Sequence, residues 1–381
     1  MSPSPLSEYL DERTLSERLE RAVPIFGREE PSAHFSTSDW MSGLSDNTKI
    51  VDLNLPGTHN SATWGYSDAR QAELVKYTGS IRAPVFYRCQ ERSISQSLHD
   101  GIRVLDLRLG YNAATGTIGL VHGPAMLAST TTLHDVFCSL YNWIFAHPTE
   151  TVLVFIYQQL QNSEDDRKFE EIVFDTLNDG LAKRFWLQRA GELGTLGEAR
   201  GKLILLQRFT YQFRSAPSHH FGVYFDPEQW TPNGKDVQLI FNAEPKRLAY
   251  IQVSMQVPFC TRLMKHVEDN FHPLVSCNSG AEPNIASKFK VTIEHLEKYM
   301  DAPLQAEVAA EALYVSFASA HAKYDEVAVT PDMIALGDAA TRGMNERLLA
   351  FFGQHKGKRF GIVLLDFYHS QPGLVQAIIG L

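Results

Sequence analysis

Cysteine is scarce in this chain, and the patterns in which cysteine and histidine usually hold zinc are missing. The 381 residues include only four cysteines, and these are widely scattered: Cys89, Cys138, Cys260 and Cys277. Neither CxxC nor HExxH occurs, which excludes a zinc ribbon and a zincin-type protease. Because scattered cysteines in apolar surroundings do not make a disulfide framework, we expect reduced, buried thiols.

Long apolar runs and an excess of positive charge are also missing. No stretch of about 20 apolar residues could span a bilayer. Charged residues interrupt residues 1–30, where a signal peptide would need an apolar core. We therefore expect a cytoplasmic protein and leave peripheral attachment to a membrane open. The formal net charge of -9 argues against nucleic acid as a partner and against strong attraction to anionic lipids.

Two segments rich in aromatic residues could still provide apolar contact with a membrane. They are residues 77–87 and 221–230. The alternative is that the same rings pack on the rim of the fold, and we favour that interpretation.

What the sequence does contain is a series of apolar runs that alternate with helical patterns. Continuous apolar runs are typical of parallel strands buried on both faces. The expected strands are 50–55, 103–109, 117–121, 151–157, 202–208, 248–255, 312–318 and 359–365. The expected helices are 132–146, 165–178, 257–270, 332–352 and 372–379. About eight strands alternating with helices predict an α/β fold with a TIM-like (β/α)₈ barrel.

Two histidines and an arginine lie at the ends of such runs. His59 and His122 sit in short turns that contain glycine, and Arg108 ends the run 103–109. The carboxyl ends of the strands form the active face of an α/β barrel. Cleaving a phosphodiester without a metal requires a base, an acid and a fixed cation. Histidine can serve as base or acid near neutral pH, and the planar fork of arginine binds two phosphate oxygens. A histidine beside glycine is by itself more often a turn residue, so the hypothesis depends on the combination.

Four motifs accompany these residues: GTHNS at 57–61, QERSISQSLHDGIRVLDLRL at 90–109, VHGP at 121–124 and HPTE at 147–150. Together they resemble the X domain of phosphatidylinositol-specific phospholipase C, most closely its bacterial-type, metal-independent branch. The resemblance covers residues 45–381. It implies a TIM-like barrel, often irregular or incompletely closed. It also implies a lyase reaction, in which the inositol 2-hydroxyl attacks its own phosphate and releases diacylglycerol and a cyclic inositol phosphate.

The resemblance assigns catalytic roles to individual residues. His59 matches the general base and His122 the general acid. Asp366, which follows the run 359–365, matches the aspartate that orients the base; capping of the following helix is its alternative role. Arg108 matches the arginine of the bacterial type, at a position where the calcium-dependent enzymes carry a carboxylate.

A metal at this site is not expected. Calcium takes six to eight oxygen ligands, and only Asn60 and Asp106 are candidates. Arg108 would place a positive charge in the same site. We therefore expect neither a metal nor another cofactor, and we expect Asp106 to hold Arg108 or a backbone amide within the substrate site.

The chain departs from the family pattern in three places. Asn60 stands where the bacterial type usually has an aspartate, and an amide cannot raise the pKa of His122 as a carboxylate would. The acid and the aromatic residue common after the sixth strand are replaced, as is a lysine common after the fourth, whereas Arg208 matches an arginine that reaches the headgroup. We therefore expect the acid–base chemistry of the family to be retained, and the pocket for the headgroup to differ from the family pattern. The expected substrate-binding residues are Asp106, Arg208, Tyr157, Gln158, Val253 and Met255.

The expected domains are an N-terminal extension, residues 1–44, and a catalytic barrel, residues 45–381. Leu15, Leu19 and Val23 are spaced along one helical face, so part of the extension is expected to be helical; a frayed tail is the alternative.

These observations predict an enzyme, a phospholipase C-like phosphodiesterase acting on phosphatidylinositol or a related phosphodiester. Two alternatives stay open. One is the same chemistry on a different, soluble substrate. The other is a non-catalytic binding protein on this fold, against which the joint presence of His59, Arg108, His122 and Asp366 argues.

Overall fold

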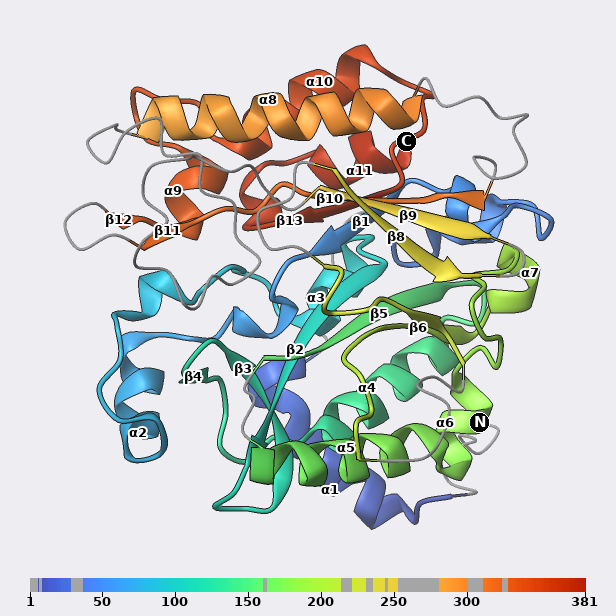
Figure 1. Ribbon diagram of the computed structural model, residues 1–381, viewed down its shortest axis with the longest axis vertical. Helices are drawn as coiled ribbons and strands as arrows, with labels where there is room; N and C mark the ends of the chain where they lie inside the picture. Colours follow the sequence, from blue (N-terminus) through green and yellow to red (C-terminus); the bar gives the residue numbers. More distant parts are fainter. Residues whose placement is uncertain are drawn as a thin grey trace. The chain divides into compact units, whose positions relative to one another are not determined.

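The computed structural model describes residues 6, 9–28, 37–159, 163–213, 221–230, 236–243, 246–252, 281–300, 311–323 and 328–381 (Figure 1). The chain divides into two compact units. Unit 1 comprises residues 1–50, 60–87 and 91–224, and unit 2 comprises residues 51–59, 88–90 and 225–381. The chain therefore passes from unit 2 to unit 1 at the peptide bond between His59 and Asn60.

The core of unit 1 is a sheet of four parallel strands in the order β7-β6-β5-β2. Its strands are β2 (Val104–Asn112), β5 (Thr151–Gln158), β6 (Lys202–Arg208) and β7 (Val223–Tyr224). The first six residues of β5 are buried, and burial on both faces explains why the apolar run is unbroken. β3 (Thr117–His122) pairs antiparallel with β2, and β4 (Ala125–Met126) pairs antiparallel with β3.

Helices and short 3₁₀ turns complete unit 1. The helices are α1 (Glu12–Phe26), α2 (Asp68–Thr78), α3 (Ile94–His99), α4 (Leu133–Ala146), α5 (Ser163–Asn178), α6 (Gly180–Phe185) and α7 (Leu196–Ala199). α1 begins after Asp11, whose side chain accepts a hydrogen bond from the backbone N–H of Thr14. It packs against α4, where Arg21 forms an ion pair with Asp135 at 2.8 Å. Residues 12–26 therefore form a docked helix and not a frayed tail.

A fully buried ion pair joins the starts of β2 and β5. Arg103 donates through Nη2 to Glu150 at 2.7 Å, and neither side chain is exposed. The same guanidinium also donates to the carbonyl oxygens of Leu98, Ile102 and Thr37. These contacts satisfy a buried charge that would otherwise be costly, so the GIR and PTE portions of the sequence motifs stabilise the fold.

Unit 2 also holds four parallel strands, in the order β1-β13-β10-β9, and β8 pairs antiparallel with β9. The strands are β1 (Leu55–Thr58), β8 (Val237–Asn242), β9 (Arg247–Gln252), β10 (Leu313–Phe317) and β13 (Ile362–Leu365). β11 (Ala322–Lys323) and β12 (Ala328–Val329) form a separate ribbon. The helices are α8 (Ala281–Met300), α9 (Pro331–Leu336), α10 (Met344–Gln354) and α11 (Leu374–Ile379). The longest of them, α8, packs against β9, β10, α9 and α10.

Several sequence predictions need correction. The run 50–55 starts as a 3₁₀ turn, Ile50–Asp52, and only its last residue lies in β1. The run 117–121 is a strand but is antiparallel to β2, and β7 is the parallel strand that the sequence prediction missed. The expected helix 332–352 is two helices, because Gly337 adopts φ 72° and its neighbourhood leaves no room for a Cβ. The expected helix 257–270 and the end of the run 248–255 lie outside the described residues.

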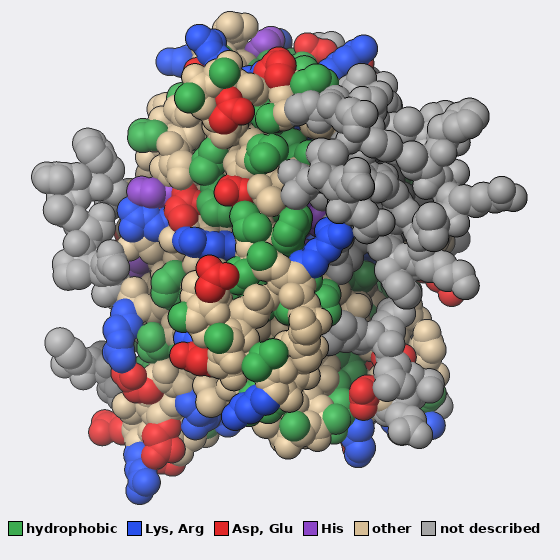
Figure 2. All heavy atoms as spheres, turned by 90° about the vertical axis from the view of Figure 1, so that its left-hand side faces the viewer, with side chains coloured by type: hydrophobic (Ala, Val, Ile, Leu, Met, Phe, Trp, Pro, Cys, Tyr) green, Lys and Arg blue, Asp and Glu red, His purple; other side chains and the backbone are tan. Residues whose placement is uncertain are grey.

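The surface and the cysteines add two observations. No described helix is long and apolar enough to cross a membrane. Acidic and basic side chains are interspersed on the face that Figure 2 shows. Cys89 and Cys138 are buried, and neither takes part in a disulfide; Cys260 and Cys277 lie outside the described residues.

Candidate active site

In unit 2, His59 and Asp366 form a buried hydrogen-bonded pair. β1 and β13 pair in parallel from Leu55–Ile362 to Thr58–Leu365, and the two residues follow directly after these strands. The distance between Nδ1 of His59 and Oδ1 of Asp366 is 2.8 Å, with both side chains at most 1% exposed. An ionised carboxylate can only accept, so Nδ1 donates and Nε2 is left with the lone pair that a general base needs.

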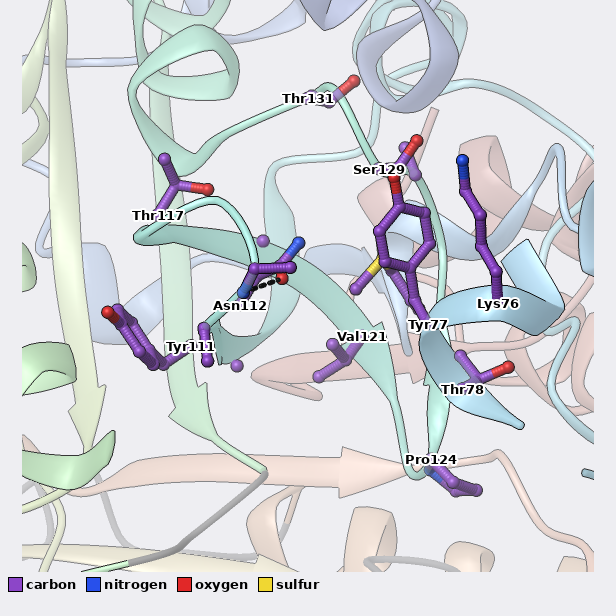
Figure 3. Close-up of a pocket in the computed structure, with 16 residues that line it drawn as sticks. Lys76, Tyr77, Thr78, Tyr111, Asn112, Thr117, Val121, Pro124, Ser129 and Thr131 are labelled. Carbon is purple, nitrogen blue, oxygen red and sulfur yellow. Dashed lines mark hydrogen bonds between the residues drawn. The ribbon is translucent and has the colours of Figure 1, made fainter. Parts of the chain in front are cut away.

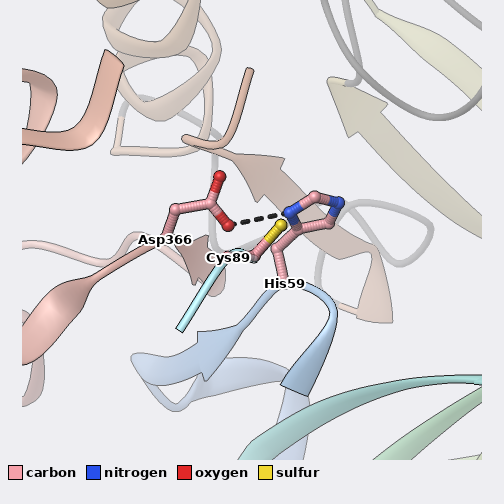
Figure 4. Close-up of side chains that lie close together, drawn as sticks. All are labelled: His59, Cys89 and Asp366. Carbon is pink, nitrogen blue, oxygen red and sulfur yellow. Dashed lines mark hydrogen bonds and ion pairs between the residues drawn. The ribbon is translucent and has the colours of Figure 1, made fainter. Parts of the chain in front are cut away.

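Hydrogen bonds from neighbouring segments hold this pair in place. Gln90 donates through Nε2 to the carbonyl oxygens of His59 (2.7 Å) and Leu365 (2.8 Å). Asn345 donates to the carbonyl of Asp366 at 2.9 Å. The backbone N–H of Phe367 donates to the carbonyl of Cys89 at 2.9 Å. Side chains of His59, Cys89 and Asp366 consequently meet in one place (Figure 4).

Helix α8 contributes polar side chains to the interior of unit 2, which sequence reasoning missed. Lys288 is fully buried, and burial lowers its pKa to about 7, although the nearby charge of Asp366 acts in the opposite direction. With the amide of Gln252 turned to satisfy both contacts, its oxygen accepts from Nζ of Lys288 and its nitrogen donates to the carbonyl of Phe317, each at 3.1 Å. About two turns further on, the ring of His295 forms a hydrogen bond with the hydroxyl of Ser316 at 2.8 Å, and burial lowers the pKa of His295 to about 4. The spacing 288, 292, 295 of buried polar residues on one helical face was the available signal.

In unit 1, Asn60 connects His122 to Asp106. Asn60 adopts a left-handed conformation with φ 45°, which asparagine tolerates better than most residues. Its backbone N–H donates to Oδ2 of Asp106 at 3.0 Å, and its Nδ2 lies 3.2 Å from Nε2 of His122. The other ring nitrogen of His122, Nδ1, lies 2.7 Å from the carbonyl oxygen of Tyr87. A carbonyl only accepts, so Nδ1 carries a proton and Nε2 faces the Asn60 amide.

A row of two guanidinium groups and one aromatic ring lies across the sheet of unit 1. Arg108, Tyr157 and Arg208 are register neighbours on β2, β5 and β6, so they share a face of the sheet. The guanidinium carbon of Arg208 lies 4.3 Å from the centre of the Tyr157 ring, and that of Arg108 lies 5.8 Å away. Asp106 holds Arg108 at 3.2 Å through Oδ2. Two cations fixed on one face of the sheet, on either side of an aromatic ring, can bind phosphate oxygens.

Comparison with known proteins shows which proteins part of this chain resembles. Residues 77–209 match the family model described as Phosphatidylinositol-specific phospholipase C, X domain. The 1-phosphatidylinositol phosphodiesterase of Listeria monocytogenes is 26% identical over 193 residues, which are 50% of this chain and 55% of that protein. The human PI-PLC X domain-containing protein 1 is 24% identical over 216 residues, 52% of this chain and 64% of that protein. The chain spans about half the length of the curated relatives it matches.

Solved structures extend the likeness to most of the chain. The phosphatidylinositol-specific phospholipase C of Staphylococcus aureus has a TM-score of 0.67 at 18% identity, covering 91% of this chain and 97% of that one. The enzyme of Listeria monocytogenes has a TM-score of 0.57 at 20% identity, with 91% and 98% covered. The predicted α/β fold class, a TIM-like barrel, is confirmed by this likeness. Residues 77–209 are thus similar in sequence to the X domain of phosphatidylinositol-specific phospholipase C, and most of the chain is similar to it in fold.

The X-domain match contains one part of the predicted site and leaves out the other. Arg108, His122 and Arg208 lie within residues 77–209, whereas His59 and Asp366 lie outside them. His59 could therefore be identified only from the turn motif at 57–61, and Asp366 only from its place at the end of β13.

Other predicted substrate residues are not gathered with this row. Gln158 follows Tyr157 and points to the opposite face of β5, where it donates to Asp166 at 2.5 Å. Val253 and Met255 lie outside the described residues. Of the four aromatic rings in the segment 221–230, those of Phe221, Phe225 and Trp230 are at most 4% exposed and that of Tyr224 is half-buried, which agrees with the packing alternative.

Unit 1 has a further cavity between α2 and the β2–β3 hairpin (Figure 3). Its volume is about 470 Å³. The lining is mixed, with hydroxyl groups, an amide and one ammonium group, and includes Lys76, Tyr77, Asn112, Thr117, Ser129 and Thr131. None of the predicted catalytic residues lines it.

Proposed function

We propose that this X-domain protein is a phospholipase C-like phosphodiesterase that cleaves phosphatidylinositol, or a closely related phosphodiester, without a metal. The observation that carries the proposal is the hydrogen bond of 2.8 Å between His59 and Asp366, which joins positions 307 residues apart. A barrel core needs no such buried imidazole–carboxylate pair, and a general base does. The names of the relatives, 1-phosphatidylinositol phosphodiesterase, support the substrate class.

The acid and base are connected through the chain itself. His59 and Asn60 are consecutive, so their Cα atoms are about 3.8 Å apart, and the side chain of Asn60 contacts His122. In the proposed reaction, Nε2 of His59 takes the proton of the attacking inositol 2-hydroxyl while a new P–O bond forms. His122 gives a proton to the departing diacylglycerol oxygen as the old P–O bond breaks. Arg108 and Arg208 bind the phosphate oxygens, whose charge rises in the transition state.

Asn60 must turn its amide for His122 to act as an acid. With Nδ2 toward His122, Nε2 is an acceptor and carries no proton; with the oxygen toward His122, Nε2–H donates to Asn60. The protonated acid corresponds to the second orientation.

The experiment is a turnover assay on purified protein with phosphatidylinositol vesicles in excess chelator. ³¹P NMR should detect a cyclic inositol phosphate as the first product. His59→Ala and His122→Ala should each lose at least about a hundredfold in rate, whereas His369→Ala, an exposed histidine outside the site, should not. Normal activity of both site variants would reject the assignment of acid and base.

A second candidate, the same chemistry on a soluble phosphodiester, is favoured by one observation. Tyr157 lies between two guanidinium groups, at a position where the family commonly has a lysine. Parallel assays with glycerophosphoinositol and other water-soluble diesters separate the candidates. Faster turnover of a soluble diester than of vesicles would favour the second one, and no turnover of any diester would favour a binding protein.

Peripheral contact with membranes through residues 77–87 is also part of the proposal. Tyr77 is 38% exposed and Val85 41% exposed, and Val75, two residues before Tyr77 in α2, is 49% exposed. A structure of the Staphylococcus aureus enzyme is described as concerning modulation of its membrane binding. Tyr77→Ala and Val85→Ser should weaken co-sedimentation with neutral vesicles while leaving turnover of a soluble diester unchanged.

A further inference from the structure

Three side chains of metal-binding type meet at the base of the proposed site. His59 follows β1, Cys89 lies in the segment that precedes α3, and Asp366 follows β13. One ligand atom from each residue lies within 4.8 Å of the others, and all three residues are buried. Figure 4 shows the sulfur of Cys89 near the bond between His59 and Asp366.

The segments that carry these ligands are held together by hydrogen bonds that do not use the ligand atoms. Gln90, the neighbour of Cys89, donates to the carbonyl oxygens of His59 and Leu365. The N–H of Phe367, the neighbour of Asp366, donates to the carbonyl of Cys89. The three side chains are thus presented toward one point by a backbone that is already fixed, which lowers the cost of organising a binding site.

The ligand set selects the kind of metal. One imidazole, one thiolate and one carboxylate, with a fourth position for water or a phosphate oxygen, is a set that Zn²⁺ accepts. Ca²⁺ and Mg²⁺ prefer several oxygen ligands and do not favour a thiolate. With metal–ligand bonds of about 2.0 to 2.3 Å, tetrahedral ligand atoms lie roughly 3.5 Å apart. Side-chain rotations that move each ligand atom by roughly 1 Å would therefore bring the three atoms to tetrahedral spacing around one ion.

We propose that His59, Cys89 and Asp366 form an inhibitory site for Zn²⁺. The ion replaces the hydrogen bond between Nδ1 and Asp366 and binds Nδ1 through its lone pair. To free this lone pair the imidazole changes tautomer, so that its proton leaves Nδ1 and Nε2 becomes protonated, and the thiol of Cys89 releases its proton to solvent. Because Nε2 is now protonated, His59 cannot take a proton from a substrate hydroxyl. Binding of the ion therefore stops base catalysis without blocking Arg108 or His122.

Access to the site rests on the proposed function, because a base that acts on a substrate hydroxyl has to be reached by that hydroxyl. The same approach admits a small hydrated ion. The binding itself does not depend on activity, so it can be tested even if no phosphodiester is turned over.

The test uses Co²⁺ as a spectroscopic substitute for Zn²⁺ in the complete 381-residue chain. Thiolate ligation gives an intense ultraviolet charge-transfer band, which we expect at one ion per chain and which added Zn²⁺ should remove. Cys89→Ala should lose the band, and its affinity for Zn²⁺ should fall at least about tenfold. Cys138→Ala, the matched control, removes a buried cysteine outside the cluster and should keep both. Absence of the band in wild type, or an equal band in Cys89→Ala, would overturn the proposal.

A second variant with a folding control, and a zinc-inhibition assay, guard against loss of the band through misfolding. Cys89→Ser retains the size of the side chain, and near-ultraviolet circular dichroism reports whether either variant is folded. In the turnover assay, Zn²⁺ should inhibit wild type reversibly, with recovery in chelator, and the Cys89 variants should need at least about ten times more Zn²⁺. A wild type that binds Co²⁺ through Cys89 but has no activity rejects the proposed function and retains the metal site. Equal zinc inhibition of wild type and folded Cys89→Ala rejects the inhibitory site.

Discussion

The side-chain amide of Asn60 lies 3.2 Å from Nε2 of His122, while Nδ1 of the same ring lies 2.7 Å from the carbonyl oxygen of Tyr87. Both ring nitrogens of the proposed acid therefore contact neutral groups. A carboxylate at position 60 would instead stabilise the imidazolium form.

We predict that Asn60→Asp raises the pKa of His122. The alkaline limb of the rate profile, which reports loss of the acid's proton, should move to higher pH by about one unit. NMR titration of the His122 ring measures the same shift without substrate. Asn47→Asp, at an exposed position, serves as the control and should leave both curves in place; an unchanged His122 titration in Asn60→Asp would contradict the prediction.

The shape of the Arg108 guanidinium should matter for turnover as well as its charge. Arg108→Lys keeps a cation but loses the planar fork that can hold Asp106 and phosphate together, so kcat/KM should fall by about a hundredfold or more. Wild-type turnover should persist in excess chelator. Loss of turnover in chelator with specific recovery on adding Ca²⁺ would instead assign the protein to the metal-dependent branch.

Lys288 should make stability depend on pH. Its pKa is lowered by burial from 10.5 to about 7, so between these values the unfolded chain binds a proton that the folded chain does not, and stability rises with pH. Relative to wild type, Lys288→Met should gain up to about 5 kcal/mol of unfolding free energy as the pH is lowered from about 10.5 to about 7. Urea unfolding at several pH values measures this difference. Lys290→Met, on the exposed side of α8, should follow the wild-type curve.

The buried pair of Arg103 and Glu150 should be structural. Glu150→Gln leaves a guanidinium that is 0% exposed without its charged partner, and we expect a loss of about 3 to 5 kcal/mol in unfolding free energy. Glu17→Gln disrupts an exposed pair with Arg13 and should cost less than about 1 kcal/mol. Equal losses in the two variants would show that burial is not the cause.

The strands that carry the site could be predicted because a strand buried on both faces has an unbroken run of apolar residues. β5 and β6 were located in this way almost to the residue, and His59 was placed correctly after β1. The direction of β3 could not be predicted, since a short apolar run is compatible with parallel and antiparallel pairing. The break at Gly337 was missed because its backbone conformation depends on the close approach of the following turn.

The missed residues of the site have a common physical reason. Lys288 reaches Gln252, and Cys89 reaches the bond between His59 and Asp366, only when strands distant in sequence are in register. The helical spacing 288, 292, 295 marks a shared face of α8 but does not say that this face is buried, and Cys89 is a single cysteine outside any periodic pattern. The left-handed turn at Asn60 was likewise invisible, although asparagine is among the residues that adopt it.

The pairing of β1 with β13 has a consequence for the newly synthesised chain. At a translation rate of about 5 to 20 residues per second, the 307 residues between His59 and Asp366 separate their emergence by about 15 to 60 s. The segments holding Asn60, Arg108 and His122 are complete long before Asp366 is made. A ribosome-bound chain would therefore carry the groups proposed to bind and protonate a phosphodiester, while His59, the proposed base, still has no aspartate to orient it.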